Sequence, residues 1–355
     1  MEKNLKIGLH DVGINSPTYF IADIASNHDG SLNKAKDLIH MCAEAGANAA
    51  KFQNFFGRTL ISDTAFKKLG NVSHQSEWEG SVFESYDRVS VPLDWTSHLQ
   101  DECKKFNIDY FTSPYDLNLI DELNKYVCAW KIGSGEITWH DSIEKMAKLN
   151  KPIILATGAS NLSEVQDAVK LILRFNKDLI LMQCNTNYTG SVDNFNFINL
   201  NVLKTFRKNF PGIILGLSDH TPGHSTVLGA VTLGARVIEK HFTDNNNLSG
   251  PDHKFSMNPK DWKNMVDRTR ELEMSLGVAT KKVEKNEIET VIIQRRGIRV
   301  CKDVKKGEII SESHLSFLRP CTEDCLAPYQ KNLIIGKKAK FNLKKNQVVN
   351  EDSIE

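Results

Sequence analysis

The stretch Ile213-Ile214-Leu215-Gly216-Leu217-Ser218-Asp219-His220 is a short apolar run that ends in a histidine. A second run, Val237-Ile238-Glu239-Lys240-His241-Phe242-Thr243, also carries a histidine at its end, and a segment long enough for a helix separates the two. If both runs are parallel strands, both imidazoles emerge at the same end of one sheet. Two imidazoles so placed indicate a site of the size that a divalent metal occupies.

Apolar runs of this kind recur over residues 18–276 and alternate with amphipathic segments. They are short and apolar on both faces, which is typical of buried parallel strands. The eight predicted strands are Tyr19–Ala25, Ala49–Phe55, Asp109–Ser113, Ala129–Gly133, Pro152–Thr157, Leu179–Cys184, Ile213–Ser218 and Arg236–His241. Eight strands that are each followed by a helix fit an α/β fold of the (β/α)8 TIM-barrel type best. An open doubly wound sheet is the alternative.

The composition excludes several classes of protein. A formal net charge of +1 over 355 residues gives no strong field that would attract nucleic acid or acidic membranes. The N-terminal residues lack the apolar core of a signal peptide, and no apolar run approaches the roughly 20 residues that span a bilayer. Seven cysteines without regular pairing indicate reduced thiols. We therefore expect a cytoplasmic protein that binds neither nucleic acid nor membranes.

The alternation of apolar runs and amphipathic segments ends near Lys281. The stretch Lys281–Asn286 is charged, and residues 281–292 are predicted to link a catalytic barrel domain at 1–280 to a small β-rich domain at 293–355. In the small domain, Gly297–Val300 and Asp303–Ile310 are predicted to form short strands around a glycine turn. Further short strand–turn pieces are expected at 334–336 and 342–349.

Polar residues recur at the C-terminal end of every predicted barrel strand, where function gathers in this fold. Burying so many polar groups without partners would cost several kcal/mol for each group. We therefore expect these groups to share one polar site. The connection over residues 55–92 follows the second strand at the same end and includes Ser73–Trp78. Its unusual length is more typical of a functional loop than of a passive one.

Two lysines, Lys51 and Lys131, lie inside apolar strands and need anionic partners. One interpretation is a structural ion pair with Asp23 or Glu239. The other is a pair of ammonium groups that bind a phosphate or carboxylate. The run Lys131-Ile132-Gly133-Ser134-Gly135 favours the second, because glycines let the backbone approach an anion and Ser134 adds a hydroxyl.

The histidine pair can be weighed in the same way. A single histidine at a strand end is usually a hydrogen-bonded core residue, whereas His220 and His241 on adjacent strands favour a metal site. Two imidazoles with water and substrate oxygens suit Mn²⁺, Fe²⁺, Co²⁺ or Zn²⁺, and a site with only two protein ligands leaves room for Lewis-acid chemistry. Glu239 and Asp219 are expected to orient ligands or waters around it. Asp252, in the loop after the eighth strand, either belongs to a solvated connector or faces a polyol substrate.

In order and spacing, these motifs resemble the sialic acid synthase (N-acetylneuraminate synthase) family, which includes legionaminic and pseudaminic acid synthases. The resemblance covers nearly the whole chain. In the barrel it rests on Ile21–Gly30, Lys51–Gln53, Lys131–Glu136, Gly216–Thr221 and Ile238–Thr243. In the tail, Arg295–Gly297 and Leu318–Pro320 resemble the family's antifreeze-like (SAF) domain.

The resemblance implies a transferase that condenses phosphoenolpyruvate with an N-acyl amino-hexose, giving a nonulosonic acid and phosphate by C–C bond formation and C–O cleavage. It implies a domain-swapped homodimer and a metal held by His220 and His241. We expect this metal to be Mn²⁺, with Mg²⁺ or Co²⁺ as alternatives. The residues implied to bind substrate or to act in catalysis are Asp23, Lys51, Gln53, Lys131, Ser134, Thr186, Tyr188, Ser218, Glu239, Asp252 and the partner's Arg319.

Three positions depart from the family pattern. Asp23 stands where the family usually has glutamate, Ala156 where it usually has serine, and Cys321 where it commonly has glycine. The first departure favours a sugar other than N-acetylmannosamine, such as a diacetamido-trideoxyhexose. The alternatives are another phosphoenolpyruvate-dependent 3-deoxy-ulosonate synthase acting on a different sugar, and a glycan-binding scaffold without turnover.

Overall fold

The computed structural model of the protein describes residues 4–69 and 81–355. The segment Ser73–Trp78 of the long predicted loop lies outside the described residues. The chain forms two compact units that divide after Gly277, and each is described by itself. Among the described residues, no helix combines the length and the apolar character that a bilayer crossing requires.

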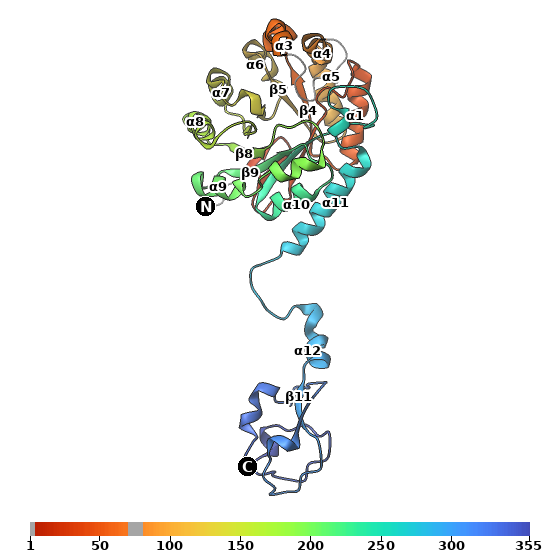
Figure 1. Cartoon of the computed structure of the whole chain (residues 1–355), viewed down its shortest axis with the longest axis vertical. Coiled ribbons are helices and arrows are strands. Elements are labelled where there is room, and N and C mark those ends of the chain that lie inside the picture. The colour runs from red at the N-terminus through yellow and green to blue at the C-terminus, as the bar shows by residue number, and fades with distance from the viewer. Residues whose placement is uncertain (1–3, 70–80) are drawn as a thin grey trace. The chain divides into compact units, whose positions relative to one another are not determined.

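The first unit is built around eight parallel strands that are surrounded by helices (Figure 1). The strands lie in the order β5-β4-β3-β10-β9-β8-β7-β6, and β5 also contacts β6, which brings the two edges of the sheet together. Their bounds are β3 (Tyr19–Asp23), β4 (Ala49–Asn54), β5 (Asp109–Pro114), β6 (Trp130–Ile132), β7 (Ile153–Ala156), β8 (Leu179–Cys184), β9 (Ile214–Asp219) and β10 (Ala235–His241). Each overlaps one predicted strand, so the (β/α)8 barrel is confirmed and the open sheet is wrong.

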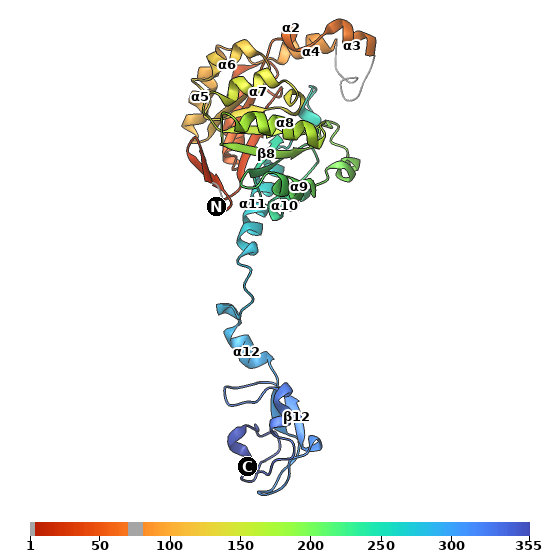
Figure 2. The same cartoon turned by 90° about the vertical axis from the view of Figure 1, so that its left-hand side faces the viewer.

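The helices follow the strands in the expected alternation. They are α1 (Leu32–Glu44), α5 (Trp95–Lys105), α6 (Leu117–Leu123), α7 (His140–Ala147), α8 (Leu162–Leu173), α9 (Val202–Asn209), α10 (Ser225–Thr232) and α11 (Pro259–Leu276). Three more helices, α2 (Gly57–Leu60), α3 (Asp63–Leu69) and α4 (Val82–Val89), occupy the long connection between β4 and α5. Figure 2 shows these three helices together on one side of the barrel.

Two apolar clusters separate the inside of the barrel from the layer beneath the helices. Side chains that alternate along each strand either fill the barrel interior or pack against the helices. A hairpin that the sequence did not predict, β1 (Asn4–Ile7) and β2 (His10–Gly13), places Leu5, Ile7 and Val12 in the interior cluster with Tyr19. Because β3 begins at Tyr19, the hairpin covers the N-terminal end of the barrel and leaves the C-terminal end for the site.

The second unit has its own small core, which includes Ile298, Val304, Leu343 and Val349. The strands β11 (Gly297–Val300) and β12 (Leu315–Leu318) pair antiparallel, and the helix α12 (Ile288–Gln294) begins within the predicted linker. The strand expected at 334–336 is absent, because these residues form a turn. The short strands predicted at 303–310 and 342–349 are present only as isolated bridges on either side of a turn. These segments meet only through isolated bridges such as Val304–Leu343, because the chain turns again before a ladder can grow.

Candidate active site

The C-terminal ends of the barrel strands surround a cavity of about 330 Å³. Neighbouring inward positions on one strand are two residues apart, so Ser218 and His220 both face the cavity, as do Glu239 and His241. The predicted site residues of the barrel all line it: Asp23, Lys51, Gln53, Lys131, Ser134, Thr186, Tyr188, Ser218, His220, Glu239, His241 and Asp252. Arg319 belongs to the second unit and follows β12.

A network of two lysines and two carboxylates lies on one side of the cavity. The Lys51 ammonium is 2.5 Å from Asp23 Oδ2 and 3.3 Å from Glu239 Oε1, and the Lys131 ammonium is also 3.3 Å from Glu239 Oε1. These side chains are each at most 5% exposed, so the charges are paired where water cannot compensate them. The predicted ion pairs are therefore present, and Glu239 joins the two lysines.

The protonation of this network follows from burial and charge together. Burial alone would raise the pKa of Glu239, but Lys131 and Lys51 outweigh it and hold this pKa at about 2. Burial would lower the pKa of Lys51, but Asp23 and Glu239 raise it above its usual value. For Lys131, burial dominates and lowers the pKa, and the charge of Lys51 adds to that effect. Glu239 is thus an ionised carboxylate that anchors both ammonium groups.

Hydroxyl groups line the cavity together with the two lysines. The Gly158 N–H donates to Ser134 Oγ at 2.9 Å, and a Cβ at Gly158 would lie 2.3 Å from Thr186 Oγ1, so only glycine fits there. Thr186 Oγ1 and Glu239 Oε2 are buried and have no hydrogen-bond partner within residues 4–69 and 81–355. Hydroxyls and ammonium groups with unused hydrogen-bonding capacity are suited to an anionic ligand.

The two predicted metal ligands lie side by side, with ring centroids 5.4 Å apart. His220 Nδ1–H donates to the Asn185 carbonyl at 2.9 Å, so its Nε2 carries the lone pair that a metal would bind. His241 Nδ1 is buried and lacks a hydrogen-bond partner among the described residues. In that same part of the chain no group of three or more His, Cys, Asp or Glu side chains could hold a metal. A divalent ion bound by these two imidazoles would have to take its other ligands from water or substrate.

Asp219 was expected to orient ligands or waters around the metal, and this prediction is wrong. Asp219 lies between the inward-facing Ser218 and His220, so its side chain points to the helix side of the sheet. There it forms a fully buried ion pair with Lys240 and accepts hydrogen bonds from the hydroxyls of Thr221 and Thr226. The pair cross-links β9 and β10 directly behind the two histidines.

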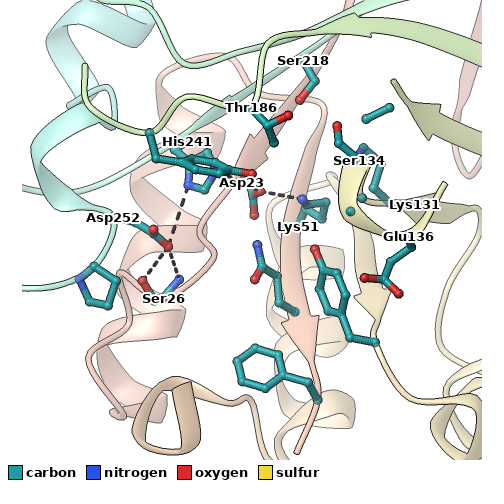
Figure 3. A pocket seen from close by; sticks show the side chains of 18 of the residues that line it. Asp23, Ser26, Lys51, Lys131, Ser134, Glu136, Thr186, Ser218, His241 and Asp252 are labelled. Carbon is teal, nitrogen blue, oxygen red and sulfur yellow. Dashed lines mark hydrogen bonds and ion pairs between the residues drawn. The ribbon is translucent and has the colours of Figure 1, made fainter. Parts of the chain in front are cut away.

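The opposite side of the cavity carries Asp252. Its Oδ2 accepts hydrogen bonds from Ser26 N–H at 3.1 Å and Ser26 Oγ at 2.5 Å, and it lies 3.9 Å from His241 Nδ1. In Figure 3, Asp252 and Ser26 lie on one side, Lys131 and Ser134 on the other, and Asp23 and Lys51 between them. The cavity therefore has a cationic half and a second half where neutral polar groups can bind.

Comparison with known proteins identifies the family. Residues 38–281 match the NeuB family, and residues 295–355 match the SAF domain. The chain belongs to the NeuB family. This confirms the resemblance to sialic acid synthases that the motifs indicated.

Several NeuB-family relatives match over nearly their whole length. The N,N'-diacetyllegionaminic acid synthase of Campylobacter jejuni is 37% identical over 338 residues, which are 94% of this chain and 99% of that protein. The pseudaminic acid synthase of Helicobacter pylori is 33% identical over 96% of this chain and 98% of its own. The solved structure of the spore coat polysaccharide biosynthesis protein SpsE from Bacillus subtilis has a TM-score of 0.66 at 30% identity and covers 99% of both chains.

Within this NeuB-family site, the structure adds residues that the sequence did not single out. Ser26 holds Asp252, Cys184 lines the cavity next to Ser134, and Tyr115 follows the end of β5. Ser26 and Tyr115 each come just after a barrel strand, so their position along the chain was a usable signal. Two of the departures from the family pattern lie in this cavity. Asp23 keeps a carboxylate in contact with Lys51, whereas Ala156 at the end of β7 presents only a methyl group.

Proposed function

We propose that this protein condenses phosphoenolpyruvate with the open-chain form of an N-acyl amino-hexose, giving a nonulosonic acid and phosphate. The observation that carries the proposal is the joint presence of two buried lysines and two histidines at the ends of one barrel. The phosphate and carboxylate of phosphoenolpyruvate need the cationic half, and the sugar aldehyde needs an electrophilic site. The names of the legionaminic and pseudaminic acid synthases that match this chain support the same reaction class.

His220 and His241 would hold the divalent cation, for which Mn²⁺ is our first choice and Mg²⁺ or Co²⁺ the alternatives. When bound, such an ion supplies Lewis-acid polarisation of the sugar carbonyl. Two observations support this assignment: His220 uses Nδ1 toward the Asn185 carbonyl, which leaves the lone pair on Nε2, and His241 Nδ1 has no hydrogen-bond partner among the described residues.

The residues of the chain account for the remaining steps. Lys51, Lys131 and Ser134 would bind phosphoenolpyruvate so that its carbon 3 faces the aldehyde carbon. The electrons of its C2–C3 double bond form the new C–C bond, and the aldehyde oxygen takes the electron pair of the C=O π bond and then a proton. Water adds to carbon 2 and gives up a proton, which balances the one taken by the aldehyde oxygen. Phosphate then leaves with the electrons of the C2–O bond, and the remaining hydroxyl of carbon 2 loses its proton to give the keto group. The two ammonium groups would offset the charge on the phosphate and carboxylate throughout.

Glu239 is suited to orient the water rather than to act as a general acid. Its low pKa keeps it ionised, and its Oε2, which has no hydrogen-bond partner in the described part of the chain, can accept a hydrogen bond from that water. Asp23, which touches Lys51 and lies 3.5 Å from His241 Nε2, is placed between the two halves and is our candidate for relaying the proton.

The second unit enters the proposal through Arg319. We propose a domain-swapped homodimer in which the partner's Arg319 faces the sugar. Mixing an Arg319→Ala protein with a Lys131→Met protein tests this arrangement, because mixed dimers contain one intact site. Activity above that of either parent is expected, and no recovery after subunit exchange would contradict the swap.

The reaction itself is tested by measuring phosphate release from phosphoenolpyruvate with N-acyl hexosamines and with sugar phosphates. The expected product has the mass of the acceptor plus pyruvic acid. A His220→Ala/His241→Ala variant should lose turnover, whereas His40→Ala, at an exposed histidine of α1, should keep it. Turnover of sugar phosphates alone would favour another ulosonate synthase, and no phosphate release with any acceptor would sink the proposal.

A further inference from the structure

A pair of cysteines in the second unit, Cys321 and Cys325, has no role in the steps above. Both carry free thiols, and both are half-buried. Cys321 stands at one of the three positions that depart from the family pattern. A glycine there would leave Cys325 without a neighbouring thiol, so the departure itself creates the pair.

The fold brings the two sulfur atoms together. The chain turns between them, because the Cys325 N–H donates to the Thr322 carbonyl at 3.0 Å. Both sulfurs lie over Gly297 of β11: a Cβ on this glycine would be 2.6 Å from Cys325 Sγ and 3.4 Å from Cys321 Sγ. The two thiols therefore share the space that a side chain at position 297 would fill. Side chains that converge in this way are what a disulfide requires.

The ends of the turn are anchored, whereas its middle is open to solvent. The Cys321 N–H donates to the Ile292 carbonyl of α12 at 3.0 Å. At the other end, the Leu326 carbonyl accepts from the Ile298 N–H at 2.9 Å. Residues 322–324 between the two cysteines are exposed. The anchors keep the thiols facing each other, and the exposed middle lets a small oxidant approach them.

Two adjacent thiols can either bind a metal or form a disulfide. Within residues 4–69 and 81–355, no group of three or more His, Cys, Asp or Glu side chains could hold a metal, and two thiols alone fall short of the four ligands of a structural zinc site. A disulfide needs only the two sulfurs. Burial and the Cys325 thiol raise the pKa of Cys321, so its thiol is not an activated nucleophile, and oxidation depends on an added oxidant.

We propose that Cys321 and Cys325 are a modification site at which a low-molecular-weight disulfide, such as oxidised glutathione, produces a reversible intramolecular disulfide. One cysteine thiolate attacks the glutathione disulfide, whose S–S bond breaks to give a mixed disulfide and one glutathione thiolate. The thiolate of the other cysteine attacks the protein sulfur of the mixed disulfide and releases the second glutathione. The two cysteine sulfurs are oxidised, glutathione disulfide is reduced to two thiols, and these take up the two cysteine protons.

The bond would constrain the chain directly after Arg319. Leu318 pairs with Gly297 in the ladder of β11 and β12, and the Pro320 carbonyl accepts from the Arg299 guanidinium at 3.0 Å. A disulfide over Gly297 would close the remaining side of this loop, so Arg319 would lose less freedom on binding a ligand. This consequence rests on the proposed function. If Arg319 faces the sugar, oxidation should lower the KM for the acceptor by about 2- to 10-fold, the cost of ordering one long side chain.

Thiol counting by mass spectrometry tests the site. The full-length protein is equilibrated with mixtures of reduced and oxidised glutathione and quenched with acid, and its thiols are then alkylated in denaturant. The reduced protein carries seven thiols. The expected oxidised form has two fewer, carries no bound glutathione, and regains both thiols with dithiothreitol. Retention of all seven thiols, or glutathione adducts alone, would overturn the proposal.

Variants and proteolysis assign the bond to this pair. Cys321→Ser and Cys325→Ser should each abolish the paired loss of thiols. Cys301→Ser is the matched control, because Cys301 is a half-buried cysteine of the same unit, and its variant should still lose two thiols. In the unsubstituted protein, a glutamate-specific protease that cuts after the exposed Glu323 should leave fragments that stay joined until reduction. Fragments that separate without reduction would place the bond elsewhere and overturn the assignment.

Kinetics of the reduced and oxidised protein test the effect on Arg319. The KM for the acceptor should fall on oxidation, while the KM for phosphoenolpyruvate stays unchanged. The variant Cys321→Ser/Cys325→Ser, treated with the same oxidant, should show no change, which separates this effect from modification of Cys184 in the cavity. An equal or higher acceptor KM in the oxidised protein would overturn the effect on Arg319. If no acceptor yields product, the proposed function fails, and the thiol count still decides the disulfide.

Discussion

The two ends of the barrel both bury charged side chains, but they use them differently. At the N-terminal end, Asp109 Oδ2 accepts hydrogen bonds from Tyr19 OH at 2.7 Å and pairs with His10 Nδ1 at 2.9 Å, and Asp109 Oδ1 accepts from Leu9 N–H. A Cβ at Gly8 would overlap the same carboxylate, so the hairpin closes tightly over it. At the C-terminal end, Glu239 Oε2, Thr186 Oγ1 and His241 Nδ1 remain unpartnered among the described residues.

This difference between the two ends indicates that one end mainly stabilises the fold and the other mainly serves function. A buried group that is fully satisfied stabilises the fold, whereas a buried group with unused hydrogen-bonding capacity costs stability until a ligand arrives. We therefore expect substitutions at the C-terminal end to change turnover more than melting temperature. Substitutions at the N-terminal end should show the reverse.

The largest expected effect is that of Lys131→Met on turnover. The change removes one of the two ammonium groups that would offset the charge of phosphoenolpyruvate, so kcat should fall about 10³-fold, equivalent to about 4 kcal/mol. Glu239 keeps its partner Lys51, and repulsion between the two ammonium groups disappears, so the melting temperature should stay level or rise. Steady-state kinetics and thermal unfolding check both parts, and a large fall in melting temperature would break the comparison.

The Asp219–Lys240 ion pair behind the histidines should raise the melting temperature, although it lies at the C-terminal end of the barrel. Lys240→Met leaves Asp219 buried without its cation, at a cost of at least about 3 kcal/mol, or roughly a 10 °C fall in melting temperature. The double variant Lys240→Met/Asp219→Leu, which leaves no unpaired charge, should recover most of that loss. A single variant as stable as the parent would show that the pair contributes little.

Addition of Mn²⁺ should raise the melting temperature by an amount between those of the preceding and following effects. At a concentration about 100 times its Kd, an ion that binds only the folded protein stabilises it by about 2.7 kcal/mol. The resulting rise in melting temperature should vanish in the His220→Ala/His241→Ala variant. It should persist in His10→Ala, whose histidine lies at the N-terminal end. The same rise in all three proteins would place the ion elsewhere.

The sequence predicted the barrel and most of the residues that line the candidate site, because both depend on local patterns. Apolar runs marked the strands, and polar residues at their ends, such as Lys51 and His241, marked one edge of the sheet. The alternation of side chains along a strand also shows that Asp219 must face away from Ser218 and His220, and that signal was missed. The hairpin over Asp109 could not be predicted, because it depends on which distant segments pack together.

The smallest expected effect is that of Tyr19→Phe, which sharpens the comparison from the N-terminal end. The substitution removes one hydrogen bond to Asp109 and leaves the ring in place, so it should cost about 1 kcal/mol and lower the melting temperature by roughly 2–4 °C. Because Asp109 begins β5 while the cavity lies beyond its other end, kcat/KM should stay within about twofold of the parent at temperatures where both proteins are folded. A marked fall in kcat/KM would mean that the two ends are coupled through the barrel interior. The division between a stabilising end and a reactive end would then not hold.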